Sequence, residues 1–193
     1  VFGGLFRPYR SCPNMRIAGW TQANPFKRQF QVNLRNHRKV LIIDGRRAFT
    51  GGVNLSDLNR TVDGHAPIRD YHFDCAGPVV QEVQFTFLRD WYFITGEAPD
   101  RLLAGRYFPM IEPQGESAVR LINGGPSSRQ EVITDAFFLA IVSARRQVLV
   151  VTPYFVPNRD ILRALRSAAL RGIDVRRVVP EKNNHFYAGQ AGR

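Results

Sequence analysis

The sequence predicts an α/β protein built in two parts, and three observations carry that prediction. A β-hairpin, a further strand and a long amphipathic helix occupy the first hundred residues. A stretch rich in glycine and proline then interrupts the pattern, and an alternating series of strands and helices follows it. We therefore expect mixed sheets flanked by helices, with a first half at 1–101, a linker at 102–117 and an incomplete second half at 118–193.

The first half begins with a short apolar strand. Residues 40–44, "VLIID", are rich in β-branched side chains, which predicts a buried strand. Asp44 and Gly45 are typical of a tight hairpin turn into a second strand at 47–50. Residues 69–77 are expected to add another strand to the same sheet.

A helix follows at 77–97 and has recognisable ends. Pro78 suits the first turn of a helix, and Gly96 suits its exit. The apolar positions expected to face inward repeat at helical spacing. They are Val80, Val83, Phe87, Trp91 and Ile94.

The second half is predicted to start with a strand at 118–122 and a helix at 127–144. Ser128 and Glu131 have the spacing of a capping box. The inward positions of this helix are expected to be Ile133, Phe137, Ile141 and Ala144.

The remaining elements of the second half predict parallel strands. The apolar run 147–155, "QVLVVTPYF", is typical of a strand covered on both faces. Asn158 should cap a helix that runs to Gly172, before a strand within 173–179. Such a βαβαβ series implies parallel strands joined by right-handed crossovers.

Charge and composition narrow the class of partner. The net charge is +11, and the positive residues are 24 arginines and three lysines. This excess suits nucleic acid, phospholipid headgroups or a phosphorylated substrate. The sequence contains no apolar run long enough to span a membrane and no signal-peptide pattern. Cys12 and Cys75 are too few for a disulfide framework or a metal site, and we expect two free thiols.

The stretch "NHRKVLIIDGRRAFTGGVN", residues 36–54, carries the candidate chemistry. His37 and Lys39 are two residues apart before a strand, so both should project from one face. An imidazole beside an ammonium suits an oxyanion, because the lysine neutralises phosphate oxygens while the imidazole attacks phosphorus or moves a proton. Asp44 has the opposite parity, so we expect it to support the structure; a direct role would require a bulge.

A glycine-rich loop completes this stretch. At Gly51 and Gly52 bare backbone can approach a ligand closely, and Asn54 adds a neutral amide donor. We therefore expect Lys39, Gly52 and Asn54 to bind the phosphate of a substrate.

The pattern H-x-K-x4-D-x6-G-G-x-N resembles the signature of the phospholipase D superfamily. The surrounding blocks "RDYHFDCAGPVVQEVQFTFLRDWYFITGE", "VTPYFVPNRDILRALRSAALRGIDVRRVVP" and "NNHFYA" are similar to its bacterial cardiolipin synthase branch. The resemblance implies a phospholipase D-like α/β sandwich that needs no cofactor and no metal. It also implies catalytic roles for His37, Lys39 and Asp44, with His37 as the nucleophile that forms a phosphohistidine.

The implied function is transfer of a phosphatidyl group to an alcohol such as phosphatidylglycerol, at the bacterial inner membrane, from a cytoplasm-facing or peripheral position. The implied partners are an anionic phospholipid, phosphatidylglycerol or cardiolipin, and the membrane surface; nucleic acid is less favoured. Two alternatives stay open. One is a phospholipase D or nuclease-type phosphodiesterase, which uses water as acceptor, and the other is a non-catalytic phosphate- or nucleic-acid-binding relative.

The sequence departs from the family pattern in one respect: members carry two H-x-K motifs, and this sequence contains one. The other histidines are His65, His72 and His185, and none is followed two residues later by lysine. His72 is expected to be structural, with a place in the cleft wall as the alternative; His185 could line the pocket. We expect the second motif beyond Arg193 or from a dimer partner, an N-terminal anchor outside this chain, and an inactive fragment on its own.

Overall fold

The structure is a computed structural model that describes residues 11–19, 36–56, 59, 67–124 and 131–180. The chain divides into two compact units, Val1–Leu121 and Ile122–Arg193. Each unit has its own sheet and its own hydrophobic core.

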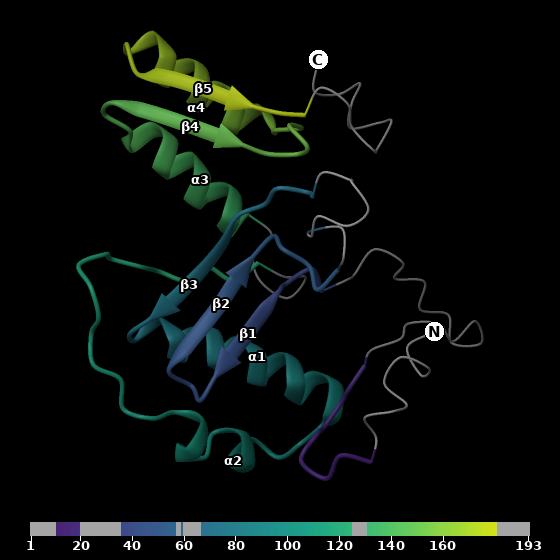
Figure 1. The fold of residues 1–193 in the computed structure, drawn as a ribbon. Helices are drawn as coiled ribbons and strands as arrows, with labels where there is room; N and C mark the ends of the chain where they lie inside the picture. The colour runs from purple at the N-terminus through teal and green to yellow at the C-terminus, as the bar shows by residue number, and fades with distance from the viewer. Residues whose placement is uncertain (1–10, 20–35, 57–58, 60–66, 125–130, 181–193) are drawn as a thin grey trace. The chain divides into compact units, whose positions relative to one another are not determined.

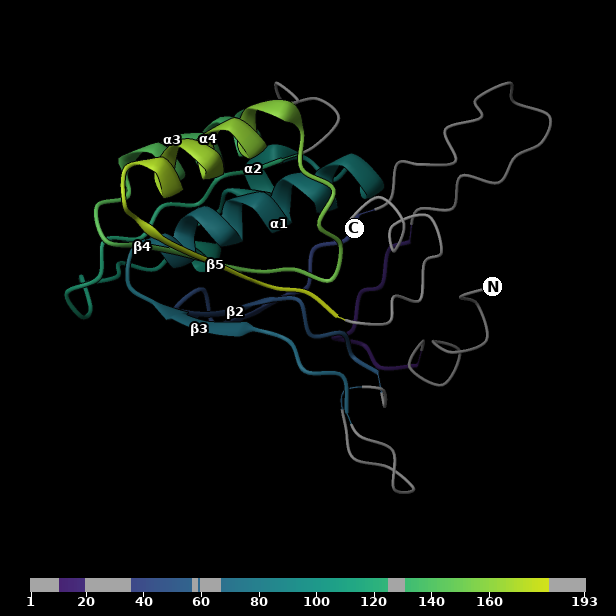
Figure 2. The same ribbon diagram turned by 90° about the horizontal axis from the view of Figure 1, so that it is seen from above.

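The first unit contains a three-stranded antiparallel sheet. Its strands are β1 (Val40–Ile43), β2 (Arg47–Gly51) and β3 (His72–Ala76), in the order β1-β2-β3. The helix α1 (Val79–Thr95) lies across one face of this sheet (Figure 1, and from above in Figure 2). The three predicted strands and the long helix are confirmed; β2 is one residue longer than predicted, and the other three elements are shorter.

The hairpin between β1 and β2 forms at the predicted residues. Asp44 and Gly45 both have positive φ, 53° and 64°, and the Arg46 N–H donates to the Ile43 carbonyl oxygen at 3.0 Å. Positive φ at both central positions is the mark of a type I′ turn. A Cβ on Gly45 would also lie 2.8 Å from the Tyr107 carbonyl oxygen. Glycine is therefore required there for conformation and for close approach.

The sheet of the first unit has one covered face. Val40 and Ile42 pack against the buried residues Ala48, Val80 and Val83, which belong to β2 and α1. The alternate residues of β1 are open, with Leu41 57% and Ile43 46% exposed. The prediction of a buried strand is therefore correct for one face and wrong for the other, because α1 covers one side only.

The ends of α1 agree with the prediction, but its inner face is partly different. Pro78 is the N-cap, and Gly96, at φ 68°, donates its N–H to the Tyr92 carbonyl oxygen. Phe87, predicted inward, is 46% exposed. Gln84, Thr86 and Leu88 are buried instead, and the contacts of α1 with the core of the sheet come from Val80 and Val83.

The segment after α1 contains two short elements, α2 (Pro99–Leu102) and the 3-10 helix η3 (Gly105–Tyr107). The strand predicted at 118–122 is wrong, since these residues pair with no strand in the part of the chain that the structure describes. An apolar run without a neighbouring strand has no ladder to join.

The second unit is a helix followed by a β-α-β element. It consists of α3 (Val132–Ser143), β4 (Gln147–Val151), α4 (Arg159–Leu170) and β5 (Asp174–Val178). β4 and β5 pair in parallel, as predicted, with Val148 opposite Val175. The Asn158 side chain accepts the Ile161 N–H at 3.0 Å, so the predicted cap of α4 is confirmed.

Three expectations for the second unit need correction. Ile133 and Phe137 are 41% and 62% exposed, and the core contacts of α3 come from Phe138, Ile141 and Val142. The helix α3 begins at Val132 with Glu131 as its N-cap, later than the predicted start at 127. The predicted capping box stays a prediction, because Ser128 lies outside the described residues.

The third correction concerns β4, which is covered on one face rather than two. Its residues alternate between exposed and half-buried, with Leu149 61% and Val151 57% exposed. Val148, on the covered face, packs against the core of Ile141, Ala164 and Ala168.

Candidate functional site

The sheet of the first unit gathers most of the predicted site residues at one end. β1 begins immediately after Lys39, β2 ends at Gly51 and β3 begins at His72. The strands are antiparallel, with Val40 opposite Thr50 and Gly51 opposite His72. This end of the sheet therefore lies next to His37 and Lys39 on one side and to the loop with Gly52 and Asn54 on the other.

The helix α1 holds the H-x-K segment in place. Asp90 of α1 accepts hydrogen bonds at one carboxylate oxygen from Arg38 Nη1, at 2.7 Å, and from Asn36 Nδ2, at 2.9 Å. The Asn36 side chain also accepts the Arg38 N–H at 2.9 Å. Asn36 and Arg38 therefore face the helix. Because side chains alternate along extended backbone, His37 and Lys39 face the opposite side of the sheet.

Both members of the H-x-K pair are accessible. His37 is exposed and Lys39 is half-buried. The ammonium of Lys39 donates to the His37 carbonyl oxygen at 2.7 Å, which keeps it close to the histidine backbone. The pair is thus open to solvent, as a site for a phosphate group requires.

The structure explains why glycine is needed at positions 51 and 52, and the sequence alone did not. The Gly52 N–H donates to the Tyr71 carbonyl oxygen at 2.9 Å, so this amide already has a protein partner. A Cβ on Gly51 would lie 2.9 Å from His72 Nδ1, and one on Gly52 would collide with the Asp70 carboxylate. The glycines thus allow the segment before β3 to approach β2.

The close approach of these segments brings two titratable residues, Asp70 and His72, to the end of the sheet next to His37 and Lys39, which we call the motif end. The sequence interpretation treated His72 as structural and did not single out Asp70. The spacing "D-x-H" at the start of a predicted strand would put both side chains on one face. In the structure β3 begins at His72, so His72 lies beside Gly51 and Asp70 lies beside Gly52. The pairing register that produces this arrangement was not available from the sequence.

Asp44 lies at the other end of β1, in the hairpin turn. Four strand residues lie between it and Lys39, so the two residues are five steps, about 16 Å, apart along the strand. β1 pairs residue by residue with β2 over its whole length, so the bulge that a direct role would require is absent from β1. The structure therefore places Asp44 in the hairpin turn, and its supporting role stays a prediction.

An ion pair fixes β2 to β3 on the face that carries the motif. Arg47 Nε donates to Asp74 Oδ1 at 2.8 Å. The hydrogen bond from Arg47 lowers the pKa of Asp74, and the Asp74 carboxylate in turn raises the pKa of Arg47. This pair stabilises the pairing that carries Gly51 and His72.

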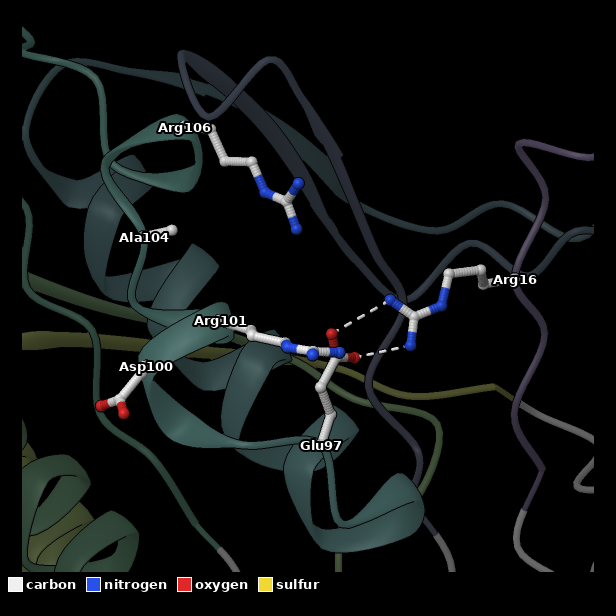
Figure 3. Close-up of a pocket in the computed structure, with 6 residues that line it drawn as sticks. All are labelled: Arg16, Glu97, Asp100, Arg101, Ala104 and Arg106. Atoms are coloured by element: carbon white, nitrogen blue, oxygen red, sulfur yellow. Dashed lines mark hydrogen bonds and ion pairs between the residues drawn. The ribbon is translucent and has the colours of Figure 1, made fainter.

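A separate cavity of about 600 Å³ lies at the C-terminal end of α1 (Figure 3). Its lining residues are Arg16, Glu97, Asp100, Arg101, Ala104 and Arg106. Arg16 donates to both oxygens of Glu97, at 3.1 and 2.6 Å, and the Trp91 indole donates to the same carboxylate at 2.9 Å. Hydrogen bonds from Arg16 and Trp91 lower the pKa of Glu97 to about 2. Two carboxylates offset much of the arginine charge, and no residue of the motif lines the cavity.

Two further properties concern metals and membranes. Over the described ranges, no group of three or more histidine, cysteine, aspartate or glutamate side chains could hold a metal ion. No helix within those ranges is both long and apolar enough to cross a bilayer.

Comparison with known proteins identifies the relatives of this chain. Residues 138–193 match the family described as "Cardiolipin synthase, PLD-like domain". The chain is 44% identical over 167 residues to a cardiolipin synthase of Geobacillus thermodenitrificans, covering 83% of this chain and 33% of that protein. It is 42% identical to cardiolipin synthase 2 of Bacillus anthracis, covering 83% and 32%, and 40% identical to cardiolipin synthase A of Pseudomonas entomophila, covering 81% and 32%.

The chain thus spans about a third of the length of the curated relatives that it matches. The comparison with solved structures found no match.

Proposed function

Because the chain belongs to the cardiolipin synthase-like family of phospholipase D-like proteins, we propose that it supplies one catalytic motif of a phosphatidyltransferase. Its substrates would be anionic phospholipids such as phosphatidylglycerol or cardiolipin. One observation carries the proposal: His37, Lys39 and the loop to Asn54 lie at one accessible end of a sheet.

The proposed reaction has two steps. A nitrogen of His37 attacks the phosphorus of the donor lipid, an N–P bond forms and the P–O bond to the headgroup alcohol breaks. An acid protonates the leaving alcohol. The acceptor alcohol then loses its proton as it attacks the same phosphorus, and the N–P bond breaks.

The supporting residues act on charge and position. Lys39 neutralises charge that develops on the phosphoryl oxygens, and the Asn54 amide donates to them. Gly52 contributes room rather than its amide, which already bonds Tyr71. Asp44 supports the motif by forming the turn at the far end of β1. The arrangement calls on no cofactor.

A second acid–base group must come from elsewhere. His37 is the one histidine in the 193 residues that is followed two positions later by lysine. We propose that a second motif, from sequence outside these residues or from a partner copy, protonates the leaving group. The family match at 138–193 supports a second phospholipase D-like half that begins within this chain. Such an enzyme would act at the bacterial inner membrane.

Hydrolysis is the second candidate, because water could replace the acceptor alcohol at the same phosphohistidine. The relatives favour the lipid transferase, since all those compared are named cardiolipin synthases. A non-catalytic phosphate-binding module is the third candidate, and it would not form a covalent intermediate.

A trapping experiment separates these candidates. The 193-residue chain is incubated with phosphatidylglycerol carrying a labelled phosphate and quenched in base, where phosphohistidine is stable. We expect label on His37 and no label in His37→Asn. Bulk turnover by the chain alone should be low, because the second acid–base group is not supplied.

A control variant tests whether loss of label is specific to His37 among the motif residues. Asp44→Asn changes a motif residue in the turn, so it should keep most of the label. Absence of label from the unmodified chain, or label that survives His37→Asn, would contradict the proposed nucleophile. Robust transfer by the purified chain as a monomer would contradict the need for a second motif, whereas robust transfer only by a dimer would assign that motif to the partner copy.

A further inference from the structure

We propose that His72 binds the same phosphodiester group as Lys39 and donates an imidazole hydrogen bond to a phosphate oxygen. This inference rests on the proposed function, and it assigns a role to a residue outside the H-x-K motif. It depends on strand register, on the absence of a side chain at Gly51 and on the exposure of the imidazole.

The register places His72 and Lys39 on either side of Gly51. Gly51 pairs with His72 across β2 and β3. Val40 pairs with Thr50, so extending the β1 register by one residue places Lys39 opposite Gly51. Neighbouring strands lie about 4.8 Å apart, so the backbones of Lys39 and His72 are separated by about 10 Å with Gly51 between them.

The middle position of this row has no side chain to fill it. A Cβ on Gly51 would stand 2.3 Å from the Tyr71 carbonyl oxygen, 2.6 Å from His72 Cα and 2.9 Å from His72 Nδ1, so the start of β3 lies against the glycine and the imidazole lies beside it. The Lys39 ammonium bonds the His37 carbonyl oxygen at 2.7 Å, and its flexible side chain would turn from that partner to meet a ligand. Lys39 and His72 would then contact one small ligand from the two strands that flank Gly51.

The chemistry of the row suits a phosphate. His72 is exposed, so its ring nitrogens are open to a ligand. An imidazole N–H and an ammonium both donate, and donors to a charged oxygen form stronger hydrogen bonds than neutral pairs. The neighbouring Asp70 carboxylate accepts the Tyr71 N–H at 2.7 Å, which fixes it beside Gly52 rather than in this row.

Histidine side-chain NMR on the 193-residue chain, with ¹⁵N-labelled histidine, tests the proposal. Two probes are titrated: dimethyl phosphate, and monomeric dihexanoyl phosphatidylglycerol. The signals of His37 and His72 are assigned by their loss in single variants. We expect both signals to move with one apparent Kd for each probe, and tighter binding of the lipid if the rest of the headgroup contributes.

Two substitutions separate binding from packing. His72→Phe keeps a planar ring without a donor and should weaken binding of both probes about tenfold, the effect of losing one hydrogen bond to a charged group. His72→Asn keeps an N–H donor and should bind within about twofold of the unmodified chain. A purely structural role predicts the reverse order, because phenylalanine fills the site better.

The outcomes distinguish this inference from the proposed function. Movement of the His37 signal without the His72 signal would overturn the role of His72 and leave the proposed function standing. Movement of neither signal would overturn both. Unchanged affinity in His72→Phe, with a melting curve like that of the unmodified chain, would also overturn the inference.

Discussion

The two ends of the first sheet are built on different principles. At the turn end, Asp44 and Gly45 adopt positive φ, and Gly45 lies against the Tyr107 backbone, so conformation and packing specify the residues. At the motif end, His37 and His72 are exposed, and hydrogen bonds to Asp90 position the segment. Substitutions at the first end should therefore act on stability, and substitutions at the second should act on chemistry.

The largest effect is expected at Lys39. Lys39→Met should slow phosphorylation of His37 by about 10²–10³-fold, because one group that stabilises the developing oxyanion is lost. The free energy of unfolding should fall by less than about 1 kcal/mol, because the half-buried side chain loses one hydrogen bond, to the His37 carbonyl oxygen. Rapid-quench labelling and urea unfolding measure the two quantities.

Lys39→Arg is the matched control, because it keeps the charge but replaces a compact ammonium by a planar group. It should recover part of the labelling rate. If Lys39→Met instead unfolded the chain and left the labelling rate per folded molecule unchanged, the contrast between the two ends would fail.

At the turn we expect a large effect on the free energy of unfolding and a small effect on the labelling of His37. Gly45→Ala should lower the free energy of unfolding by about 2 kcal/mol, because a Cβ disfavours positive φ and would stand 2.8 Å from the Tyr107 carbonyl oxygen. Labelling of His37 in the folded fraction should stay within about twofold. Gly105→Ala is a suitable control, since a Cβ there meets nothing within 4 Å. A Gly45→Ala chain as stable as the control would contradict the account of the turn.

An intermediate case is the tie between Arg38 and Asp90. Asp90→Ala should cost about 1 kcal/mol of stability, because it removes two hydrogen bonds from a carboxylate that is 29% exposed. It should also slow labelling about tenfold, because the H-x-K segment loses its anchor. Asp100→Ala, an exposed aspartate outside this contact, should change neither quantity. Loss of stability without any loss of rate would show that the tie does not position His37.

The smallest effect is a pH dependence at the far end of α1. The folded-state pKa of Glu97 is about 2, below its ordinary value of 4.5, so the Arg16 contact stabilises the fold above pH 4.5. This contribution should be lost as the pH falls from about 4.5 to about 2. Trp91 fluorescence in a Trp20→Phe background should report the loss, because the indole bonds Glu97. The transition should be absent from Glu97→Gln, and its persistence there would assign it to another group.

Local signals account for what the sequence predicted well. The Asp44-Gly45 turn, the Gly96 exit of α1 and the Asn158 cap of α4 each depend on a few neighbouring residues, and all three formed as expected. The parity of His37 and Lys39 against Asn36 and Arg38 is equally local. The structure agrees with it through the bonds to Asp90.

Long-range pairing accounts for what the sequence missed. His72 is paired with Gly51 across 20 intervening residues, and no local pattern encodes that register. The prediction of side-chain burial failed because burial also depends on long-range packing. Phe137 and Leu149 were expected inside because they are apolar, yet burial depends on which elements pack against them.

Through the Asp90 carboxylate, the position of α1 determines the position of His37. Val80 and Val83 of α1 pack in the same core as Val40 and Ile42 of the strand that follows the H-x-K segment. A methyl group lost from that core would displace the helix and, through it, the aim of a nucleophile that the altered residue never touches. Inactive variants of this chain should therefore arise in its apolar interior as well as at its polar rim.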